Sequence, residues 1–256
     1  MLEVSDLYIW FDTLDGVAYA VDGVSFNLDY GKTLGIVGES GSGKSVLSRS
    51  IIDILAKDGS VLKKGQIIFE GRDLMELSER EMRDIRGREI SMVFQNPMSS
   101  MNPVKMIGKQ ITEVLEKRMG MDRRNARSRA IKLIESVGIS DPERQLGRFP
   151  MNLSGGMLQR ISIAIALAAE PKLLIADEPT TSLDVTIQAQ ILELLRRQQI
   201  ERKMALILVT HDLGLVANYA DDIVVMYAGQ IVENCATSSL IRRPRMPYTK
   251  ALMNSA

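Results

Sequence analysis

The sequence predicts an α/β fold in which short apolar strands alternate with helices. Three observations predict it. A glycine-rich stretch from Gly38 to Ser45 stands between an apolar strand and an expected helix. A second apolar strand, Leu173 to Ala176, runs into two carboxylates, and a third, Ala205 to Val209, runs toward the only histidine of the chain. Polar residues at the carboxyl ends of buried strands are typical of open α/β sheets.

The composition is that of a globular protein. The chain has 256 residues, of which 45% are hydrophobic and 25% charged, which suits one large domain. The 32 basic and 32 acidic side chains cancel, so the net charge gives no reason to expect a nucleic-acid partner. The single cysteine, Cys235, cannot form a disulfide within the chain, which favours a reducing compartment. We see no secretory signal, and the apolar runs are shorter than the ~20 residues of a membrane span.

Short β-type runs separated by turns fill the first part of the chain. The expected strands are Leu7 to Phe11, Val24 to Leu28, Thr33 to Val37, Ile67 to Phe69 and Ile90 to Phe94. A helix is expected from Val46 to Leu55, directly after the glycine-rich stretch. The charged stretch from Asp73 to Arg88 is expected to be solvated and partly helical.

Helical periodicity replaces the α/β pattern in the middle of the chain, over Ile107 to Met119 and Ala126 to Val137. The α/β pattern then returns, and its expected elements are the strands Leu173 to Ala176, Ala205 to Val209 and Ile223 to Met226 and the helix Ile187 to Glu201. Two prolines after Arg242 predict a loop that leads to a short helix. We therefore expect a single domain, with an α/β core and β subdomain at 1–95 and 153–235, a helical insertion at 96–152 and a tail at 236–256.

The glycine-rich stretch matches the phosphate-binding pattern G-x-x-x-x-G-K-[ST] in full. Its residues are Gly38, Glu39, Ser40, Gly41, Ser42, Gly43, Lys44 and Ser45. The glycines let consecutive backbone N–H groups converge on a phosphate, the Lys44 ammonium neutralises phosphate oxygens, and the Ser45 hydroxyl can ligate Mg²⁺. The alternative is a glycine-rich turn with an incidental lysine. ATP or GTP with Mg²⁺ is the expected ligand class.

Four further side chains follow strands whose carboxyl ends we expect at one sheet edge. Asp177 is expected in the Mg²⁺ coordination shell, and Glu178 is expected to polarise the water that attacks the γ-phosphate. The alternative is a solvated pair of carboxylates. A neutral imidazole of His211 could bridge to the γ-phosphate, although a lone histidine is more often structural. Gln95, after the strand that ends at Phe94, could reach the Mg²⁺ or the attacking water.

The segment from Leu153 to Arg160 combines a helix start with two glycines. Ser154 suits the N-cap of a helix with a buried face. Capping does not explain Gly155 and Gly156, since each glycine costs a helix roughly 1 kcal/mol. Bare N–H groups at the positive end of a helix let an anion approach. A capped helix and a second phosphate-binding site therefore both remain open on these residues alone.

Taken in order, these motifs resemble the ATP-binding-cassette (ABC) ATPases along nearly the whole chain. The motifs are the glycine loop, Gln95, Leu153 to Gly156, Asp177 with Glu178, Ser182 to Asp184, and His211. The resemblance implies a P-loop NTPase (RecA-like) core with an N-terminal antiparallel β subdomain and a helical insertion. It also implies that ATP is the nucleotide.

The same resemblance assigns roles at an interface between subunits. Ser154, Gly155 and Gly156 would complete the ATP site of a partner subunit in a head-to-tail dimer, and Asp184 would lie across the same interface. These ATPases also stack an aromatic residue on adenine ahead of the glycine loop. Tyr19 is our candidate and Phe11 the competing one, and a core-packed strand residue is the equally weighted alternative for Tyr19.

A narrower resemblance is to the peptide and nickel import ATPases. It rests on Val93 to Pro97, Met101 to Pro103, Ala176 to Thr181, Asp184 to Gln190, and the tail Arg243 to Leu252. In that tail, Met246 replaces the histidine of the subfamily motif Pro-x-His-Pro-Tyr-Thr. The pair Met157 and Leu158 resembles the nickel and metal-chelate members. The chain stops at Ala256 without the cysteine-rich segment of many oligopeptide members, so we expect a short, nickel-type subunit or a truncated one.

The expected function is that of an ATPase subunit of an ABC importer for small peptides, nickel or metal chelates, peripheral on the cytoplasmic face of the membrane. The expected partners are a second, distinct ATPase subunit, two membrane permeases and an extracytoplasmic solute-binding protein, and no nucleic acid. A soluble ABC ATPase in DNA repair or translation is the alternative, although such proteins usually have a long coiled-coil insertion or two cassettes. A P-loop kinase would need neither the Leu-Ser-Gly-Gly segment nor the lone histidine.

Overall fold

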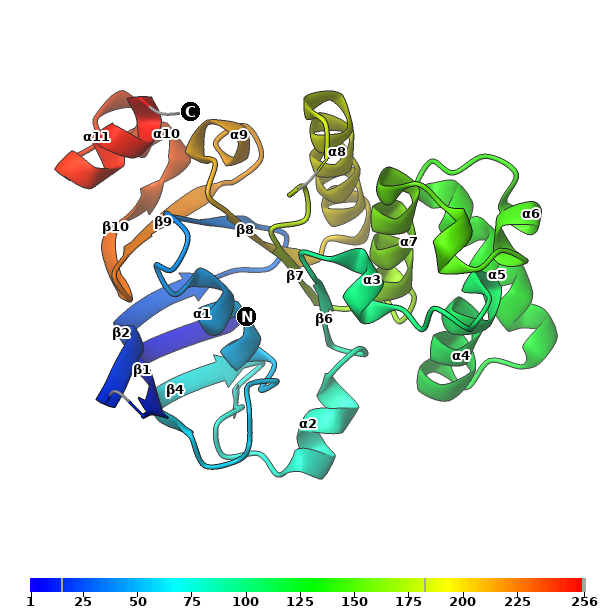
Figure 1. Cartoon of the computed structure of the whole chain (residues 1–256), viewed down its shortest axis with the longest axis horizontal. Helices are drawn as coiled ribbons and strands as arrows, with labels where there is room; N and C mark the ends of the chain where they lie inside the picture. Colours follow the sequence, from blue (N-terminus) through cyan, green and yellow to red (C-terminus); the bar gives the residue numbers. More distant parts are fainter. Residues whose placement is uncertain (15, 182, 255–256) are drawn as a thin grey trace. The chain divides into compact units, whose positions relative to one another are not determined.

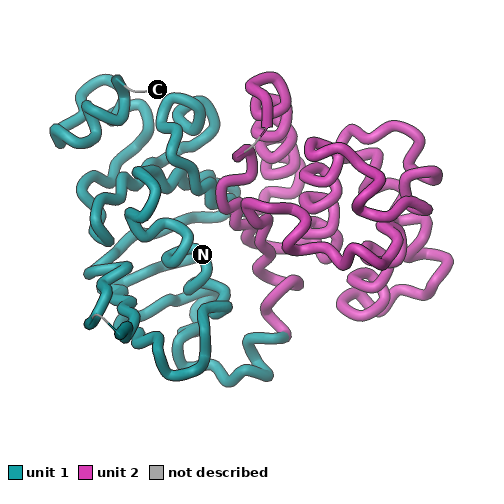
Figure 2. The backbone as a smooth tube through the Cα atoms, viewed as in Figure 1, with its two compact units in different colours: residues 1–83, 205–256 teal, residues 84–204 magenta. Residues whose placement is uncertain are grey.

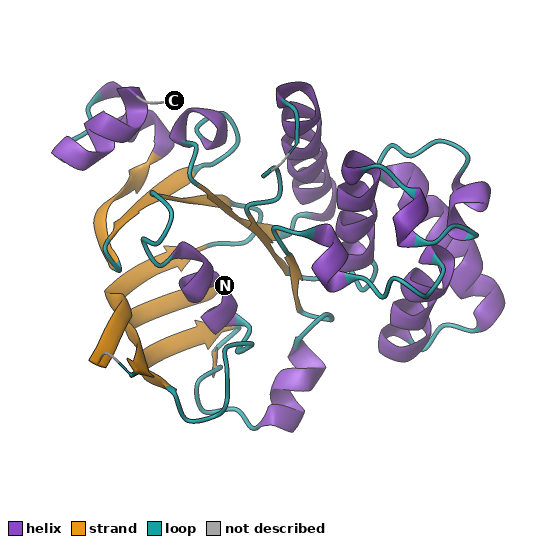
Figure 3. Cartoon of the chain, viewed as in Figure 1, coloured by secondary structure: helices purple, strands orange, loops and turns teal. Residues whose placement is uncertain are grey.

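The computed structural model describes residues 1–14, 16–181 and 183–254, and most of its elements are labelled in Figure 1. The chain forms two compact units, shown in different colours in Figure 2. Unit 1 consists of Met1–Arg83 and Ala205–Ala256, and unit 2 of Asp84–Met204. Unit 1 holds most of the strands, whereas unit 2 is mainly helical (Figure 3).

An antiparallel sheet occupies the N-terminal part of unit 1. Its strands, in spatial order, are β2 (Gly16–Leu28), β1 (Leu2–Thr13), β4 (Val61–Phe69) and β5 (Arg72–Asp73). The buried residues of β1 have even numbers up to Val4 and odd numbers from Leu7 onward. A bulge between them, where Asp6 has a φ of 46°, shifts the register and keeps the apolar side chains on one face.

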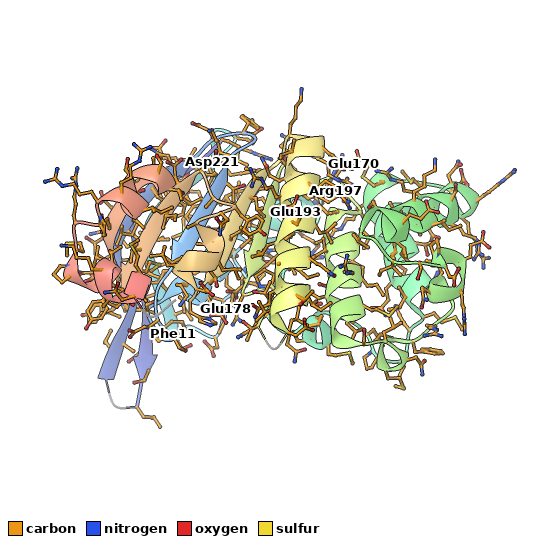
Figure 4. All side chains as sticks on the ribbon, turned by 90° about the horizontal axis from the view of Figure 1, so that it is seen from above. Phe11, Glu170, Glu178, Glu193, Arg197 and Asp221 are labelled. Carbon is orange, nitrogen blue, oxygen red and sulfur yellow. The ribbon has the colours of Figure 1, made fainter. Side chains whose placement is uncertain are left out.

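A second set of strands in unit 1 carries the glycine-rich loop. Strand β3 (Thr33–Val37) lies between β8 (Ala205–Thr210) and β9 (Asp222–Tyr227) and is parallel to both, and β10 (Gln230–Ala236) is antiparallel to β9. Every residue of β3 and β8 is buried, as expected for parallel strands covered on both faces. Asp221, labelled in Figure 4, accepts hydrogen bonds from Thr33 N at 2.8 Å and Lys32 Nζ at 3.1 Å and so anchors the start of β3.

The helices assigned to unit 1 are short. They are α1 (Lys44–Ile51), α9 (Leu213–Val216), α10 (Thr237–Arg242) and α11 (Pro247–Asn254), and the unit boundary falls within α2 (Glu79–Ile85). The expected extension of α1 to Leu55 is wrong. Asp53 adopts a left-handed conformation with a φ of 52°, and its carboxylate pairs with Lys57 and Lys63, both at 2.6 Å. This turn directs the chain away from the helix axis.

The strand β10 was not predicted. Its sequence, Gln-Ile-Val-Glu-Asn-Cys-Ala, lacks an apolar alternation, because the residue that it buries is Glu233, at 8% exposure. Its last residue is Ala236, and α10 begins at Thr237. The short helix expected in the tail is confirmed as α11, which begins at the second proline, Pro247.

Unit 2 combines helices with two parallel strands, β6 (Ile90–Val93) and β7 (Leu173–Asp177). The helices are α3 (Pro97–Ser100), α4 (Ile107–Met119), α5 (Arg123–Ser136), α6 (Pro142–Leu146), a 3₁₀ turn (Pro150–Asn152), α7 (Gly155–Leu167) and α8 (Val185–Arg202). The expected bounds of α4 are confirmed. Helix α5 begins three residues earlier than expected because Asp122 caps it, accepting from Arg124 N at 2.9 Å and Asn125 N at 3.0 Å.

Helix α7 forms the core of unit 2. It contacts α3, α4, α5, α8 and β6, and its Ile161, Ile163 and Ala164 are fully buried, since a helix surrounded by others is apolar on most of its circumference. Arg197, on α8 in Figure 4, donates a hydrogen bond to Ser136 O at 2.6 Å and ties α8 to the end of α5. Across the described ranges, no helix is both long and apolar enough to cross a membrane.

Replacing Gly65 tests the packing of the bulge. Gly65 has a φ of +112°, and a Cβ there would lie 2.3 Å from Asp6 O. We therefore expect Gly65→Ala to lower the free energy of unfolding by about 2–4 kcal/mol, combining backbone strain with overpacking. Gly71 is the matched control, because it has a φ of +76° but open space around its Cβ position, so Gly71→Ala should cost only about 1 kcal/mol. Urea denaturation of both variants measures the difference, and equal losses would contradict this account.

Candidate nucleotide-binding site

The glycine-rich loop of unit 1 joins β3 to α1 and packs against the backbone of two other strands. A Cβ on Gly38 would lie 2.3 Å from Met226 O at the end of β9, and a Cβ on Gly43 would lie 2.1 Å from Ala20 O on β2. Gly43 also has a φ of +100°, which side chains rarely adopt. Only glycine fits at these two positions, so the path of the loop is set by backbone contacts.

Lys44 lies folded back over this loop. It is the first residue of α1 and is 3% exposed. Its ammonium donates hydrogen bonds to Gly38 O at 2.8 Å and Glu39 O at 2.7 Å, which satisfy a charge that would be costly to bury alone. A positive charge and the N–H groups of the first turn of α1 therefore lie together, and both favour an anion.

His211 lies at the same sheet edge as the loop. It directly follows β8, whose last residue, Thr210, pairs with Val37 at the end of β3. The parallel register therefore brings His211 and Gly38 to neighbouring positions at the carboxyl ends of the two strands, as expected. The histidine is exposed, and the next residue, Asp212, caps α9 by accepting from Leu215 N at 2.8 Å.

Tyr19 is on the surface of β2. Its side chain is 65% exposed, and its ring centroid lies 6.3 Å from that of Trp10 on β1. The alternative of a core-packed strand residue is therefore wrong. Phe11, the competing aromatic residue, is half-buried on β1.

Unit 2 brings Gln95 and Glu178 into direct contact. Val93 pairs with Ala176 in the parallel register of β6 and β7, so both strands end at one edge. Gln95 Nε2 donates to Glu178 Oε2 at 2.8 Å, and Thr181 Oγ1 donates to the same oxygen at 2.9 Å. Glu178, labelled in Figure 4, has a φ of 47°, a conformation that is uncommon for glutamate and clusters at functional sites. Two neutral donors thus hold this carboxylate in one orientation.

Asp177 differs from Glu178 in its surroundings. It is the last residue of β7 and is 1% exposed, whereas Glu178 is half-buried. A buried carboxylate, the Ser45 hydroxyl and the Gln95 amide oxygen are all hard oxygen donors of the kind that Mg²⁺ prefers. Asp177 and Gln95, both in unit 2, fit a magnesium ion by their chemistry, and the Ser45 hydroxyl of unit 1 is a donor of the same class.

Ser154 has the local capping role that the sequence left open. It is the N-cap of α7, and its hydroxyl accepts from Met157 N at 3.4 Å, a long hydrogen bond. A Cβ on Gly156 would lie 3.2 Å from Ile187 Cγ2, whereas the nearest atom to a Cβ on Gly155, Leu183 Cδ2, is 3.8 Å away. A Cβ would therefore be crowded at Gly156, whereas packing gives no structural reason for Gly155.

Asp184 likewise caps a helix, since its carboxylate accepts from Ile187 N at 3.0 Å at the start of α8. Ile187 is also the residue nearest to Gly156, so the structure places the starts of α7 and α8 side by side. Asp184 is exposed. Ser182, which belongs to the same sequence motif, lies outside the described residues.

Sequence reasoning missed two supports of the glycine-rich loop. Gly229 N, in the turn between β9 and β10, donates to Ser42 O at 3.1 Å. Glu39 N donates to the hydroxyl of Tyr248 on α11 at 2.9 Å. The only signal for the second contact was the Pro-Tyr-Thr motif of the tail, to which no role had been assigned.

Comparison with known proteins gives consistent sequence matches. The family model described as ABC transporter matches residues 21–181. The oligopeptide transport ATP-binding protein OppD of Bacillus subtilis (strain 168) is 55% identical over 255 residues, which cover 100% of this chain and 71% of the relative. The dipeptide transport ATP-binding protein DppD of Escherichia coli (strain K12) is 48% identical, covering 100% and 78%. These relatives give no specific support to the nickel alternative.

Solved structures match the fold. The dimeric post-hydrolysis state of the ATP-binding cassette MJ0796, bound to ADP and Pi, has a TM-score of 0.82 and 25% identity, covering 93% of this chain and 99% of that one. CbiO1 from Clostridium perfringens, part of the ABC transporter complex CbiONQ, has a TM-score of 0.79 and 26% identity, covering 99% and 98%. The predicted fold class is thereby confirmed.

Proposed function

Because this chain belongs to the ABC transporter family of ATP-binding proteins, we propose that it is the ATPase subunit of an importer of oligopeptides or dipeptides. Similarity to peptide-transport ATP-binding proteins along the whole chain is the observation that carries the peptide assignment. The geometry of the phosphate loop and of the Gln95–Glu178 pair supports the ATPase assignment.

In this proposal the residues of unit 1 bind the nucleotide. Backbone N–H groups within the loop from Gly38 to Ser45 and the ammonium of Lys44 hold the phosphates. This requires Lys44 to exchange its loop carbonyl partners for phosphate oxygens. His211, at the same edge, donates a hydrogen bond from its imidazole N–H to an oxygen of the γ-phosphate. Tyr19 stacks on adenine, for which its exposed ring is suited.

The residues of unit 2 carry the chemical step. Glu178 accepts a proton from the attacking water, and its hydrogen bonds with Gln95 and Thr181 fix the orientation of the carboxylate. Asp177 and Gln95 would hold Mg²⁺, which neutralises charge on the phosphates when bound. The order of these residues along the chain is that of the ABC ATPases, which supports the assignment.

Dimerisation completes each site in this proposal. Ser154 and Gly155, at the start of α7, face the phosphates bound by a partner subunit, and Asp184 lies at the same interface. The exposure of all three residues supports this role, as does the dimeric state of the similar cassette MJ0796. The partner is a related but distinct ATPase chain, and the complex also contains two permeases and an extracytoplasmic solute-binding protein. The chain is then peripheral on the cytoplasmic face of the membrane.

Uptake measurements test the transport function. In cells that lack this chain, uptake of a labelled peptide of two to five residues should fall to background and return when the chain is restored, while uptake of ⁶³Ni²⁺ should not change. Loss of nickel uptake with normal peptide uptake would overturn the peptide assignment. Unchanged uptake of both would overturn the importer assignment.

Glu178→Gln tests the catalytic base. The amide keeps the size of the side chain but cannot accept a proton, so we expect turnover of the assembled complex to fall by about 100-fold or more with ATP binding retained. Glu193→Gln, on the exposed face of α8 in Figure 4, is the matched control and should leave turnover unchanged. Phosphate release assays measure both, and near-normal turnover in Glu178→Gln would refute the assignment.

Gly155→Ala separates a binding role from a folding role. Alanine favours a helix over glycine by about 0.5–1 kcal/mol, and the site has room for a Cβ, so the variant should unfold at a slightly higher temperature. Turnover should nevertheless fall by roughly tenfold to 100-fold, because the methyl group displaces the phosphates that approach the N–H groups. Gly147→Ala, whose Cβ would also meet only an ordinary contact, serves as the control. A stabilised Gly155→Ala variant with normal turnover would exclude the phosphate-binding role.

A further inference from the structure

The C-terminal helix of unit 1 touches the phosphate loop through one hydroxyl group. Tyr248, the second residue of α11, accepts a hydrogen bond from Glu39 N at 2.9 Å, although the two residues are 209 positions apart. Glu39 is the second residue of the loop, next to Gly38. Its N–H is fixed in direction by the backbone, so an acceptor on α11 constrains the conformation of the loop itself.

The ring of Tyr248 is held by packing. Its centroid lies 4.6 Å from that of Tyr227, with an angle of 54° between the planes, a tilted arrangement that is favourable for aromatic pairs. Tyr227 ends β9, directly after Met226, whose carbonyl oxygen contacts the loop at Gly38. The strand that supports the start of the loop therefore also supports the ring.

The N-terminus of α11 is anchored by a buried carboxylate. Glu233 on β10 accepts hydrogen bonds from Arg245 N at 3.0 Å, Met246 N at 3.3 Å and Thr249 Oγ1 at 2.7 Å. Burial alone would raise the pKa of Glu233, but these hydrogen bonds outweigh it and the pKa is lowered, so the carboxylate stays ionised at neutral pH. A negative charge at this end of a helix is stabilising.

We propose that Tyr248 is a positioning residue of the nucleotide site, which holds the phosphate loop in its binding conformation through Glu39. This inference rests on the proposed role of the loop in binding ATP. The ring could pack on Tyr227 equally well as phenylalanine, so the hydroxyl serves the contact with Glu39. The loop contains three glycines, and its part between the packed Gly38 and Gly43 has conformational freedom to lose. An acceptor that orders the loop before ATP arrives lowers the entropic cost of binding.

Tyr248→Phe tests this proposal in the assembled complex. Loss of one hydrogen bond should raise the dissociation constant and the KM for ATP by about threefold to tenfold, with kcat within about twofold of the wild type. Hydrogen–deuterium exchange at the Glu39 amide should become faster in the absence of ATP. The midpoint of thermal unfolding should stay within about 2 °C, which separates positioning from a structural role.

Tyr30→Phe is the matched control. The Tyr30 hydroxyl donates to Glu70, and Tyr30 precedes β3 whereas the phosphate loop follows it, so the control removes a hydroxyl from the opposite end of the same strand. It should leave ATP affinity and exchange at Glu39 unchanged. A loss of affinity in Tyr30→Phe equal to that in Tyr248→Phe would overturn the proposal.

Two further variants make the outcome decisive. Glu233→Gln disturbs the anchor of α11 and should also weaken ATP binding, but the double variant with Tyr248→Phe should lose less affinity than the sum of the two, since both act through one contact. Losses of affinity that simply add would contradict the proposal.

Lys44→Ala should abolish ATP binding, and if it does not, the proposed role of the loop fails. If Lys44→Ala loses binding while Tyr248→Phe binds ATP like the wild type, only the inference about Tyr248 is overturned.

Discussion

Close packing of backbone on backbone around the phosphate loop is the constraint on which the nucleotide site depends. Gly38 and Gly43 lie against the carbonyl groups of Met226 and Ala20, where no Cβ fits. Because the loop cannot move toward these strands, its N–H groups and Lys44 are held at the end of β3, and the register with β8 brings His211 to the same edge. The chemistry of unit 1 therefore follows from the way in which β2, β3, β8 and β9 are assembled.

The site residues of unit 2 are also positioned by the pairing of strands. The parallel pairing of β6 with β7 makes Gln95 and Glu178 leave their strands at one edge, where they bind each other directly. Two residues of this unit that cap helices are also candidates for the subunit interface. Ser154 and Asp184 each accept a hydrogen bond from their own helix, yet both remain exposed at neighbouring helix starts. A structural role for these residues does not exclude a role at a subunit interface, because one oxygen can serve the helix while the surface around it faces a partner.

Much of the fold was predictable because its signals are local. Buried parallel strands appear as continuous apolar runs, and β3, β7 and β8 were found within one residue of their observed ends. The predictions failed where a charged side chain and its partners decide the local structure. Asp53 ends α1 early by pairing with Lys57 and Lys63, and β10 went unnoticed because the residue that it buries is the charged Glu233. The carboxylate tolerates burial because α11 and the two residues before it, further along the chain, supply its hydrogen bonds.

The sequence by itself determined the fold class, the phosphate loop and the identity of the polar residues that follow the strands, because each depends on residues adjacent in the chain. Only the tertiary structure decided which of these residues meet. It paired Gln95 with Glu178, showed that a Cβ would be crowded at Gly156 but not at Gly155, and brought Tyr248 to Glu39. Such contacts join segments far apart in the sequence, and their geometry follows from strand register and helix packing, which no local pattern encodes.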